Sequence, residues 1–192
     1  MEIKTINKND SIIQAFIEKA NVAYLARSSS YIPFEPLSIE DIRDNEQIFI
    51  VIDEEEMVAG CCLIPIRPLE IKLQHVWTDV KKARKGYASF LVNEVEKVAK
   101  EQGNQQLKLG VMAAYKPACK LYRKKGWKPY ALVANTPPAS YTISMVKYLY
   151  EKGKLRFEIK RCIRFFFNRI KFFILFRRDS TPKWLYRVVY KK

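Results

Sequence analysis

The chain has 192 residues, of which 48% are hydrophobic and 29% charged, and its formal net charge is +15. This composition excludes a fully disordered chain, because it offers enough apolar surface for one domain and an appendage. No apolar run approaches the roughly eighteen residues that span a bilayer. The first residues show no basic start followed by an apolar run, so we expect no signal peptide and a cytoplasmic location.

The charge is concentrated at one end of the chain. Residues 151–192 contain 14 Lys and Arg against 3 Asp and Glu, a net of +11, whereas residues 1–150 contain 21 against 17, a net of +4. This change in composition predicts a domain over 1–149 and a basic, aromatic tail over 150–192.

The four cysteines do not form a metal-binding or disulfide pattern. Cys61 and Cys62 are neighbours in an apolar run, and Cys119 and Cys162 are isolated in the sequence. No C-x-x-C motif is present, and the single His75 cannot complete a zinc set. We therefore expect buried thiols in a reducing compartment and no metal.

The N-terminal part predicts one strand and two helices. Residues 2–6 alternate like a short strand. Asp10 or Ser11 can cap a helix whose apolar residues follow at helical spacing. Ser38 is expected to start a second helix, with Asp41 as an acidic capping-box partner.

The following elements alternate between strands and helices. The unbroken apolar run 48–52 suits a strand covered on both faces, and a charged turn at 53–56 joins it to a second strand over 57–66. The later predicted elements are a strand over 71–78, a helix from Gly86 to Gly103, a strand over 107–111, a helix from Pro117 to Gly126, and strands over 127–133 and 141–149. This order predicts an α/β architecture.

A basic loop leads into the helix that starts at Gly86. Lys82, Arg84 and Lys85 supply positive charge, and the small residues Gly86 and Ala88 allow an anion to approach the backbone. Unpaired N–H groups and the dipole at a helix N-terminus also favour negative charge. The loop thus predicts a phosphate or pyrophosphate site, although an ordinary strand-to-helix turn has the same local pattern.

A second stretch makes the prediction specific. After this loop and the helix that it starts, the chain reads Leu109-x-Val111, then Ala118, then Leu121-Tyr122-x-x-x-Gly126-Trp127. Together the two stretches resemble motifs A and B of the GNAT family of N-acetyltransferases, and the order of elements over about 2–149 resembles that family too. The resemblance implies a GNAT fold, with a mixed, mostly antiparallel central sheet flanked by helices, to which the tail adds a basic amphipathic helix.

The resemblance also implies acetyl-CoA as co-substrate and a direct attack by an acceptor amine on the thioester carbonyl. The backbone around the loop would hold the pyrophosphate, and the end of the preceding strand would pair with the pantetheine arm. The implied cofactor-binding residues are Val76, Trp77, Thr78, Arg84, Lys85, Gly86, Tyr87, Ala88 and Ser89.

Two residues are candidates for proton transfer. Tyr122 matches the position of the family's frequent general acid, although an aromatic residue near a helix end also often packs in the core. His75 has a suitable pKa for a base at neutral pH, although a single strand histidine is more often structural. The chain departs from the family pattern at Ala83, Tyr115 and Lys72, which leaves open a catalytically weak module that acts as a membrane-associated scaffold.

The acceptor side is the least specified part of the sequence. By the same resemblance, the loop 27–36 would border the acceptor, with Tyr31 and Phe34 as substrate contacts or as loop anchors, and the turn at 135–140 as another wall. The expected acceptor is a primary amine of a small molecule or an envelope precursor. The motifs also leave open O-acyl transfer and a longer acyl donor.

The tail predicts a basic amphipathic helix. Within 153–178, apolar and aromatic residues recur at helical spacing beside Lys and Arg, and 183–192 alternates like a strand. Such a helix can lie on an anionic membrane surface, which would place the protein at the inner face of the membrane. It can also cover its own domain or form a homodimer. Nucleic acid is the least favoured partner, because the aromatic residues form one apolar stripe.

Overall fold

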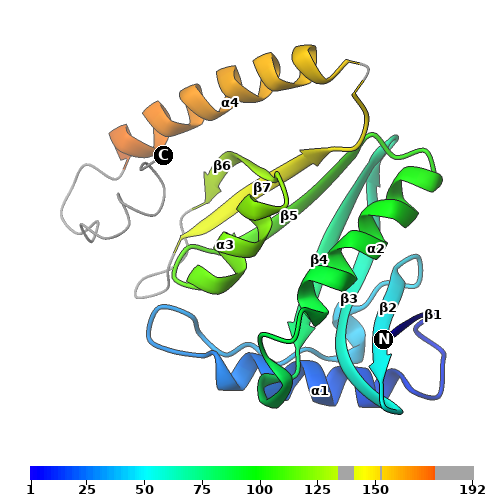
Figure 1. Cartoon of the computed structure of the whole chain (residues 1–192). Coiled ribbons are helices and arrows are strands. Elements are labelled where there is room, and N and C mark those ends of the chain that lie inside the picture. Colours follow the sequence, from blue (N-terminus) through cyan, green and yellow to red (C-terminus); the bar gives the residue numbers. More distant parts are fainter. Residues whose placement is uncertain (134–140, 152, 176–192) are drawn as a thin grey trace. The chain divides into compact units, whose positions relative to one another are not determined.

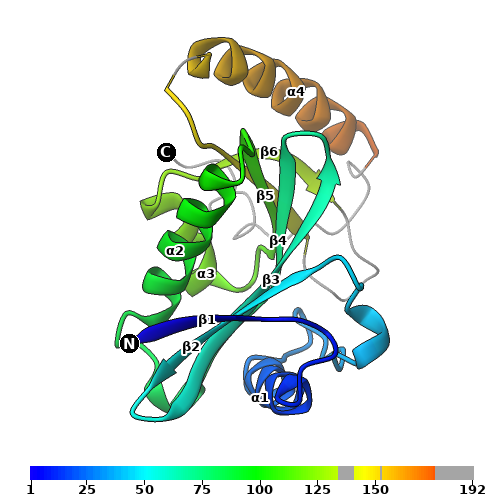
Figure 2. The same cartoon turned by 90° about the vertical axis from the view of Figure 1, so that its right-hand side faces the viewer.

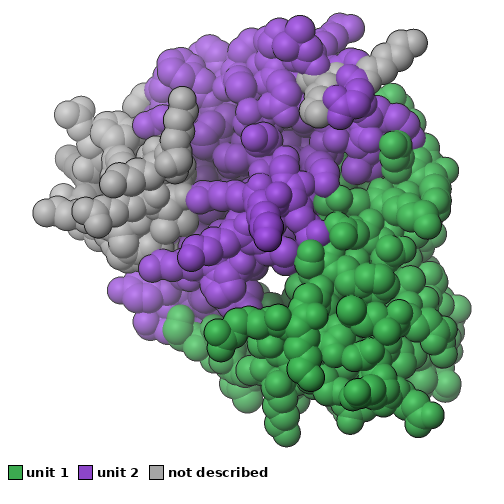
Figure 3. Space-filling model, viewed as in Figure 1, with its two compact units in different colours: residues 1–29, 33–108 green, residues 30–32, 109–192 purple. Residues whose placement is uncertain are grey.

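The computed structural model describes residues 1–133, 141–151 and 153–175 (Figure 1). The chain divides into two compact units, one made of residues 1–29 and 33–108 and the other of residues 30–32 and 109–192 (Figure 3). The predicted boundary at 149/150 stays a prediction.

The described strands form one sheet in the order β1-β2-β3-β4-β5-β7-β6. The pairs β1/β2, β2/β3, β3/β4 and β6/β7 are antiparallel, and β4/β5 is parallel. The strands are β1 (Glu2–Ile6), β2 (Gln47–Asp53), β3 (Glu56–Arg67), β4 (Glu70–Thr78), β5 (Gln106–Met112), β6 (Lys128–Val133) and β7 (Thr142–Tyr148). The helices are α1 (Ile13–Ala26), α2 (Tyr87–Glu101), α3 (Lys116–Lys124) and α4 (Lys154–Leu175), with short 3₁₀ turns η1 (Ile39–Asp41) and η2 (Val80–Lys82). The α/β class and the mixed, mostly antiparallel sheet are confirmed.

In the first unit, α1 and α2 lie on opposite faces of the sheet (Figure 2). Ile48 and Ile50 of β2 belong to the cluster that packs under α1. The alternate residues Phe49 and Val51 are equally buried, and α2 packs against β2, β3 and β4. The predicted strand covered on both faces is confirmed, because a two-sided strand needs no polar alternation.

The start of α1 differs from the prediction. The helix begins at Ile13 with Ile12 as N-cap, and no side chain caps it. Asp10 instead accepts a hydrogen bond from the N–H of Ile12 at 3.4 Å, and its carbonyl accepts one from the N–H of Ile13 at 3.1 Å. The predicted capping by Asp10 or Ser11 is therefore wrong, because a turn before the helix uses the polar groups of Asp10.

The second predicted helix is only the 3₁₀ turn η1. The capping box is present, since the N–H of Ser38 donates to Asp41 Oδ2 at 2.9 Å, and these bonds lower the pKa of Asp41. In the segment 42–45 that follows, Ile42 is buried and the other three residues are exposed, and Asp44 and Asn45 favour turns over helix. The cap was predicted correctly, but no apolar stripe follows to continue the helix.

In the second unit, α4 runs along β6 (Figure 1). Phe157 of α4 stacks on Tyr148 at the end of β7, with ring centroids 4.8 Å apart. Among the described residues, no helix combines the length and the apolar character needed to cross a membrane. The tail residues 176–192, including the predicted strand over 183–192, lie outside the described residues.

Candidate functional site

The centre of the candidate site is a bulge in β4. His75 and Val76 both lie opposite Cys61 of β3, because the register shifts there, and His75 has a left-handed φ of 53°. A non-glycine residue in this region costs about 1–2 kcal/mol. Arg27, whose guanidinium lies 4.3 Å from the ring centre of Tyr24, donates to the carbonyl of Val76 at 3.3 Å. The strained turn of β4 is thus held from the C-terminal end of α1.

Beside the bulge, the parallel ladder between β4 and β5 is short. It pairs Glu70–Lys72 with Gln106–Lys108. The rest of β4, residues 73–78, lies beyond this ladder. An extended ligand can bind a strand edge through backbone hydrogen bonds. The predicted cofactor residues Val76 and Thr78 belong to this part of β4.

A buried carboxyl group lies close to the bulge, and the sequence analysis missed it. Glu46 is 3% exposed, and its Oε1 accepts a hydrogen bond from Gln74 Nε2 at 2.8 Å. Its Oε2 is also buried, without a hydrogen-bond partner among the described residues. The available signal was an acidic residue two positions before the apolar run 48–52, and only the pairing of β2, β3 and β4 shows where its side chain reaches.

His75 lies in the electric field of this carboxyl group. Burial lowers the pKa of His75, and this effect outweighs the opposing influence of Glu46 and Asp41, while Lys72 lowers the pKa further. The imidazole is therefore mainly neutral at pH 7, which is the form that can accept a proton.

The basic loop after β4 has the geometry of an anion site. Asp79 caps η2 by accepting from the N–H of Lys81 at 2.8 Å. Arg84 and Gly86 then adopt left-handed φ values of 66° and 92°, and Gly86 is the N-cap of α2. Among the described residues, none lies within 4 Å of where a Gly86 side chain would begin. The turn is therefore open at Gly86, and the first N–H groups of an α-helix, which have no acceptor within the helix, are the groups that can bind an anion there.

The charges of this loop are not equivalent. Arg84 and Lys85 are exposed, as predicted. Lys82, by contrast, forms an ion pair with Glu56 of the β2–β3 hairpin, with Nζ and Oε2 2.7 Å apart. The prediction that Lys82 adds charge to the site is therefore weakened, because Glu56 offsets that charge.

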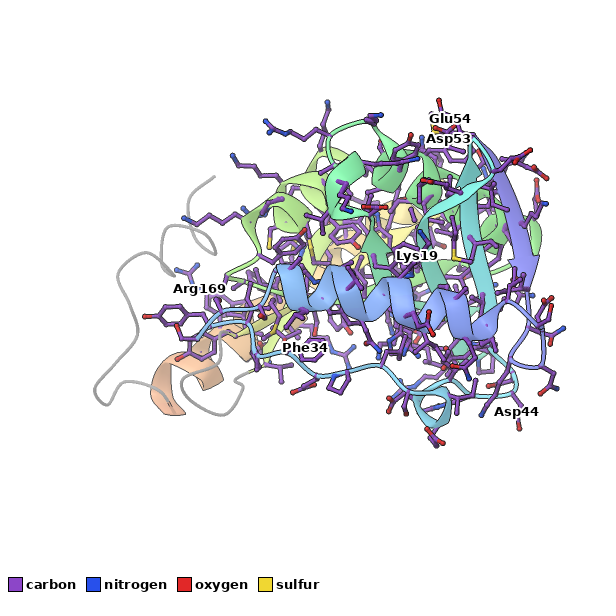
Figure 4. All side chains as sticks on the ribbon, turned by 90° about the horizontal axis from the view of Figure 1, so that it is seen from below. Lys19, Phe34, Asp44, Asp53, Glu54 and Arg169 are labelled. Atoms are coloured by element: carbon purple, nitrogen blue, oxygen red, sulfur yellow. The ribbon has the colours of Figure 1, made fainter. Side chains whose placement is uncertain are left out.

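Two predicted cofactor-binding residues have side chains that point into the fold. Tyr87 donates its hydroxyl hydrogen to Asp53 Oδ2 at 2.5 Å, and this bond lowers the pKa of Asp53 at the hairpin tip (Figure 4). Trp77 is 1% exposed and packs edge-to-face on Phe16, with ring centroids 5.8 Å apart. Both residues can contribute only backbone groups to a ligand. Ala88 and Ser89, in the same first turn of α2, are partly buried.

The second unit carries the other predicted catalytic residue. Tyr122 of α3 is 4% exposed, and its ring lies edge-to-face on Trp127 at 5.7 Å. Tyr115, where the chain departs from the family pattern, is the N-cap of α3. The packing alternative for Tyr122 is therefore present, and its role as general acid stays a prediction.

The predicted acceptor residues are exposed but belong to different units. Tyr31 is 45% exposed and lies in the second unit, whereas Phe34 is 39% exposed and lies in the first. Figure 4 labels Phe34. The turn at 135–140 lies outside the described residues. Contacts of this loop with an acceptor stay a prediction.

The thiols and acidic groups provide no metal site in the described part of the chain. Cys61, Cys62 and Cys119 are buried, as expected, and burial raises the pKa of each thiol. Cys162 on α4 is exposed, contrary to that expectation, because it lies on a side of the helix that β6 does not cover.

A seven-stranded mixed sheet with an anion-binding turn before α2 is the architecture of a GNAT-type acetyltransferase. The family model for the acetyltransferase (GNAT) family matches residues 11–127, more than half of the chain, and the chain belongs to this family.

Solved structures agree with this fold. An N-acetyltransferase from Staphylococcus aureus Mu50 is 18% identical with a TM-score of 0.63, covering 78% of this chain and 100% of its own. A ribosomal-protein-alanine N-acetyltransferase from Brucella melitensis is 16% identical with a TM-score of 0.63, covering 77% and 99%. A putative acetyltransferase from Salmonella typhimurium, solved with its cofactor acetyl-CoA, is 12% identical with a TM-score of 0.62, covering 78% and 95%. A comparison with curated proteins finds no significant match.

Proposed function

We propose that this protein is an N-acetyltransferase that transfers an acetyl group from acetyl-CoA to a primary amine of a small molecule or an envelope precursor. The observation that carries the proposal is the exposed turn formed by Arg84, Lys85 and Gly86 at the N-terminus of α2. Family membership and the acetyl-CoA bound to the similar Salmonella structure support the choice of ligand.

In the proposed reaction, the amine nitrogen attacks the thioester carbonyl carbon and the C–S bond breaks. His75 takes the proton that the amine loses, directly or through a water, which agrees with its lowered pKa. Backbone N–H groups near the bulge of β4 stabilise the oxyanion. Tyr122 returns a proton to the departing CoA thiolate. The products are an amide and CoA, and no metal takes part.

Calorimetric titration with acetyl-CoA and with CoA tests the binding step. We expect saturable one-to-one binding. Arg84→Glu should weaken the affinity about 30-fold, because it replaces attraction to the phosphates by repulsion at close range in a solvent-exposed site. Lys97→Glu is the matched control: it makes the same change of charge on an exposed residue of α2, about 16 Å further along the helix and beyond the screening length.

Equal affinities of Arg84→Glu and the wild type would refute the pyrophosphate assignment. A wild-type chain that binds neither ligand at millimolar concentration would favour the second candidate, a GNAT-fold module with a scaffolding role. The specific observation in favour of that candidate is Ala83, an exposed residue without hydrogen-bonding side-chain groups in the middle of the anion loop.

A further inference from the structure

Helix α4 contacts β6 through polar side chains. Arg161 donates from Nη1 to the carbonyl of Pro129 at 2.8 Å, and its Nε pairs with Glu158 at 2.8 Å. Asn168 Oδ1 accepts a hydrogen bond from the N–H of Leu132 at 2.8 Å. These contacts attach the helix to the backbone of a strand at the end of the sheet.

The opposite face of α4 is apolar and exposed, and we call it the outer stripe. Its residues and exposed fractions are Leu155 76%, Ile159 52%, Ile163 53%, Phe166 60%, Phe167 64% and Ile170 41%. Successive residues of an α-helix are turned by about 100° around its axis, so the outer stripe covers roughly 120° of the circumference of α4. Arg161, which contacts β6, lies on the side of the helix opposite the centre of the stripe. An amphipathic helix normally buries its apolar stripe against its own domain. Here that stripe faces solvent, which marks an interaction surface.

Positive charge lies along one edge of the outer stripe. Arg156, Lys160 and Arg164 are exposed and follow one another at four-residue spacing. The sequence of α4, residues 154–175, contains seven Lys and Arg and one acidic residue, Glu158, a net of +6. That single acid is already paired with Arg161. The surface therefore combines large apolar side chains with an excess of basic over acidic residues.

We propose that the outer stripe binds the surface of an anionic membrane, with α4 lying parallel to it in the headgroup layer. Its apolar side chains would enter the acyl boundary while Arg156, Lys160 and Arg164 reach the anionic headgroups. The helix is about 33 Å long, which gives the contact a large footprint. A second copy of the chain complements this surface poorly, because two helices with a net charge of +6 each would face one another.

This inference goes beyond the proposed function and does not depend on it. α4 lies outside residues 11–127, the part of the chain that the family model matches. Membrane binding and acetyl-CoA binding can therefore be measured separately, and either can fail without the other.

The test is co-sedimentation of the full chain with lipid vesicles. One set of vesicles is phosphatidylcholine alone, and the other is two parts phosphatidylcholine to one part phosphatidylglycerol. We expect binding to the anionic vesicles, and binding at least about tenfold weaker to the neutral ones. Phe166→Ser combined with Phe167→Ser should weaken binding to the anionic vesicles at least about tenfold. Arg156→Glu combined with Lys160→Glu should do the same.

The matched control replaces two exposed apolar residues of α1, Val22→Ser combined with Leu25→Ser, whose wild-type exposures are 67% and 58%. This control should bind vesicles like the wild type, and all variants should keep the wild-type affinity for acetyl-CoA. Absence of binding to the anionic vesicles would overturn the proposal, and so would equal binding to neutral ones. A lipid-free dimer that the Phe166 and Phe167 replacements convert to monomer would also overturn it and identify a subunit interface.

Discussion

Replacing Gly60 by alanine should disturb the packing between α1 and β4. A Cβ atom at this position would lie 2.7 Å from Phe16 Cε2 and 2.9 Å from Trp77 Nε1. Phe16 is fully buried and Trp77 is 1% exposed, so neither ring has solvent into which it can move. Gly60 also pairs with Trp77 in the register, next to the bulge of β4. The added methyl group must therefore displace an aromatic ring or one of the backbones.

The expected cost follows from two opposing effects. Overfilling a well-packed core costs about 1–3 kcal/mol, and two contacts below 3.0 Å place this variant at the upper end of that range. Alanine loses less backbone entropy than glycine on folding, which returns about 0.5–1 kcal/mol. We expect Gly60→Ala to lower the free energy of unfolding by about 2 kcal/mol, and Tm by about 4–8 °C.

Urea unfolding and thermal melting of the purified variant measure this loss. Gly110→Ala is the control, because its Cβ would lie 3.1 Å from a single atom, Thr142 Cγ2, and should cost less than about 1 kcal/mol. Adding Phe16→Leu to Gly60→Ala should cost less than the two single changes combined, because it removes one of the contacts. A Gly60→Ala protein as stable as the wild type would refute this account of the packing.

Two further predictions concern titrating groups. Acetyl transfer should slow as the pH falls through the pKa of His75, below about pH 6.5, because only neutral imidazole accepts the amine proton. Glu46→Gln removes a charge that raises this pKa, so the acid limb of the pH–rate profile should move to lower pH; a limb that stays in place would show that His75 is not the base. Tyr87→Phe removes the hydrogen bond that lowers the pKa of Asp53, so it should reduce Tm at neutral pH. The difference in Tm between Tyr87→Phe and the wild type should shrink below about pH 4, because Asp53 becomes protonated there. A difference in Tm that persists in acid would show that the Tyr87–Asp53 hydrogen bond is not its cause.

Helices and strands could be predicted from the sequence where they carry a regular pattern of apolar residues or a glycine in a left-handed conformation. Gly86 was predicted to start a helix, and it is the N-cap of α2 with a φ of 92°. The apolar run 48–52 was predicted to be covered on both faces, and residues 48–51 are buried. The prediction of a helix after Ser38 was wrong because a capping box does not by itself supply the apolar residues that a helix needs for packing. The basic loop before α2 could be predicted as an anion site from the sequence because the signal lies in consecutive residues.

The sequence alone predicted a basic amphipathic helix within 153–178, which the structure places at Lys154–Leu175, and a basic loop that leads into α2, because periodicity and capping are properties of neighbouring residues. The tertiary structure decided the contacts that join distant segments. It brought Glu46, directly before β2, to Gln74 of β4, and it turned Arg161 rather than the outer stripe toward β6. Both outcomes depend on which backbone and side-chain groups are available on another element, and the order of residues within one element does not contain that information.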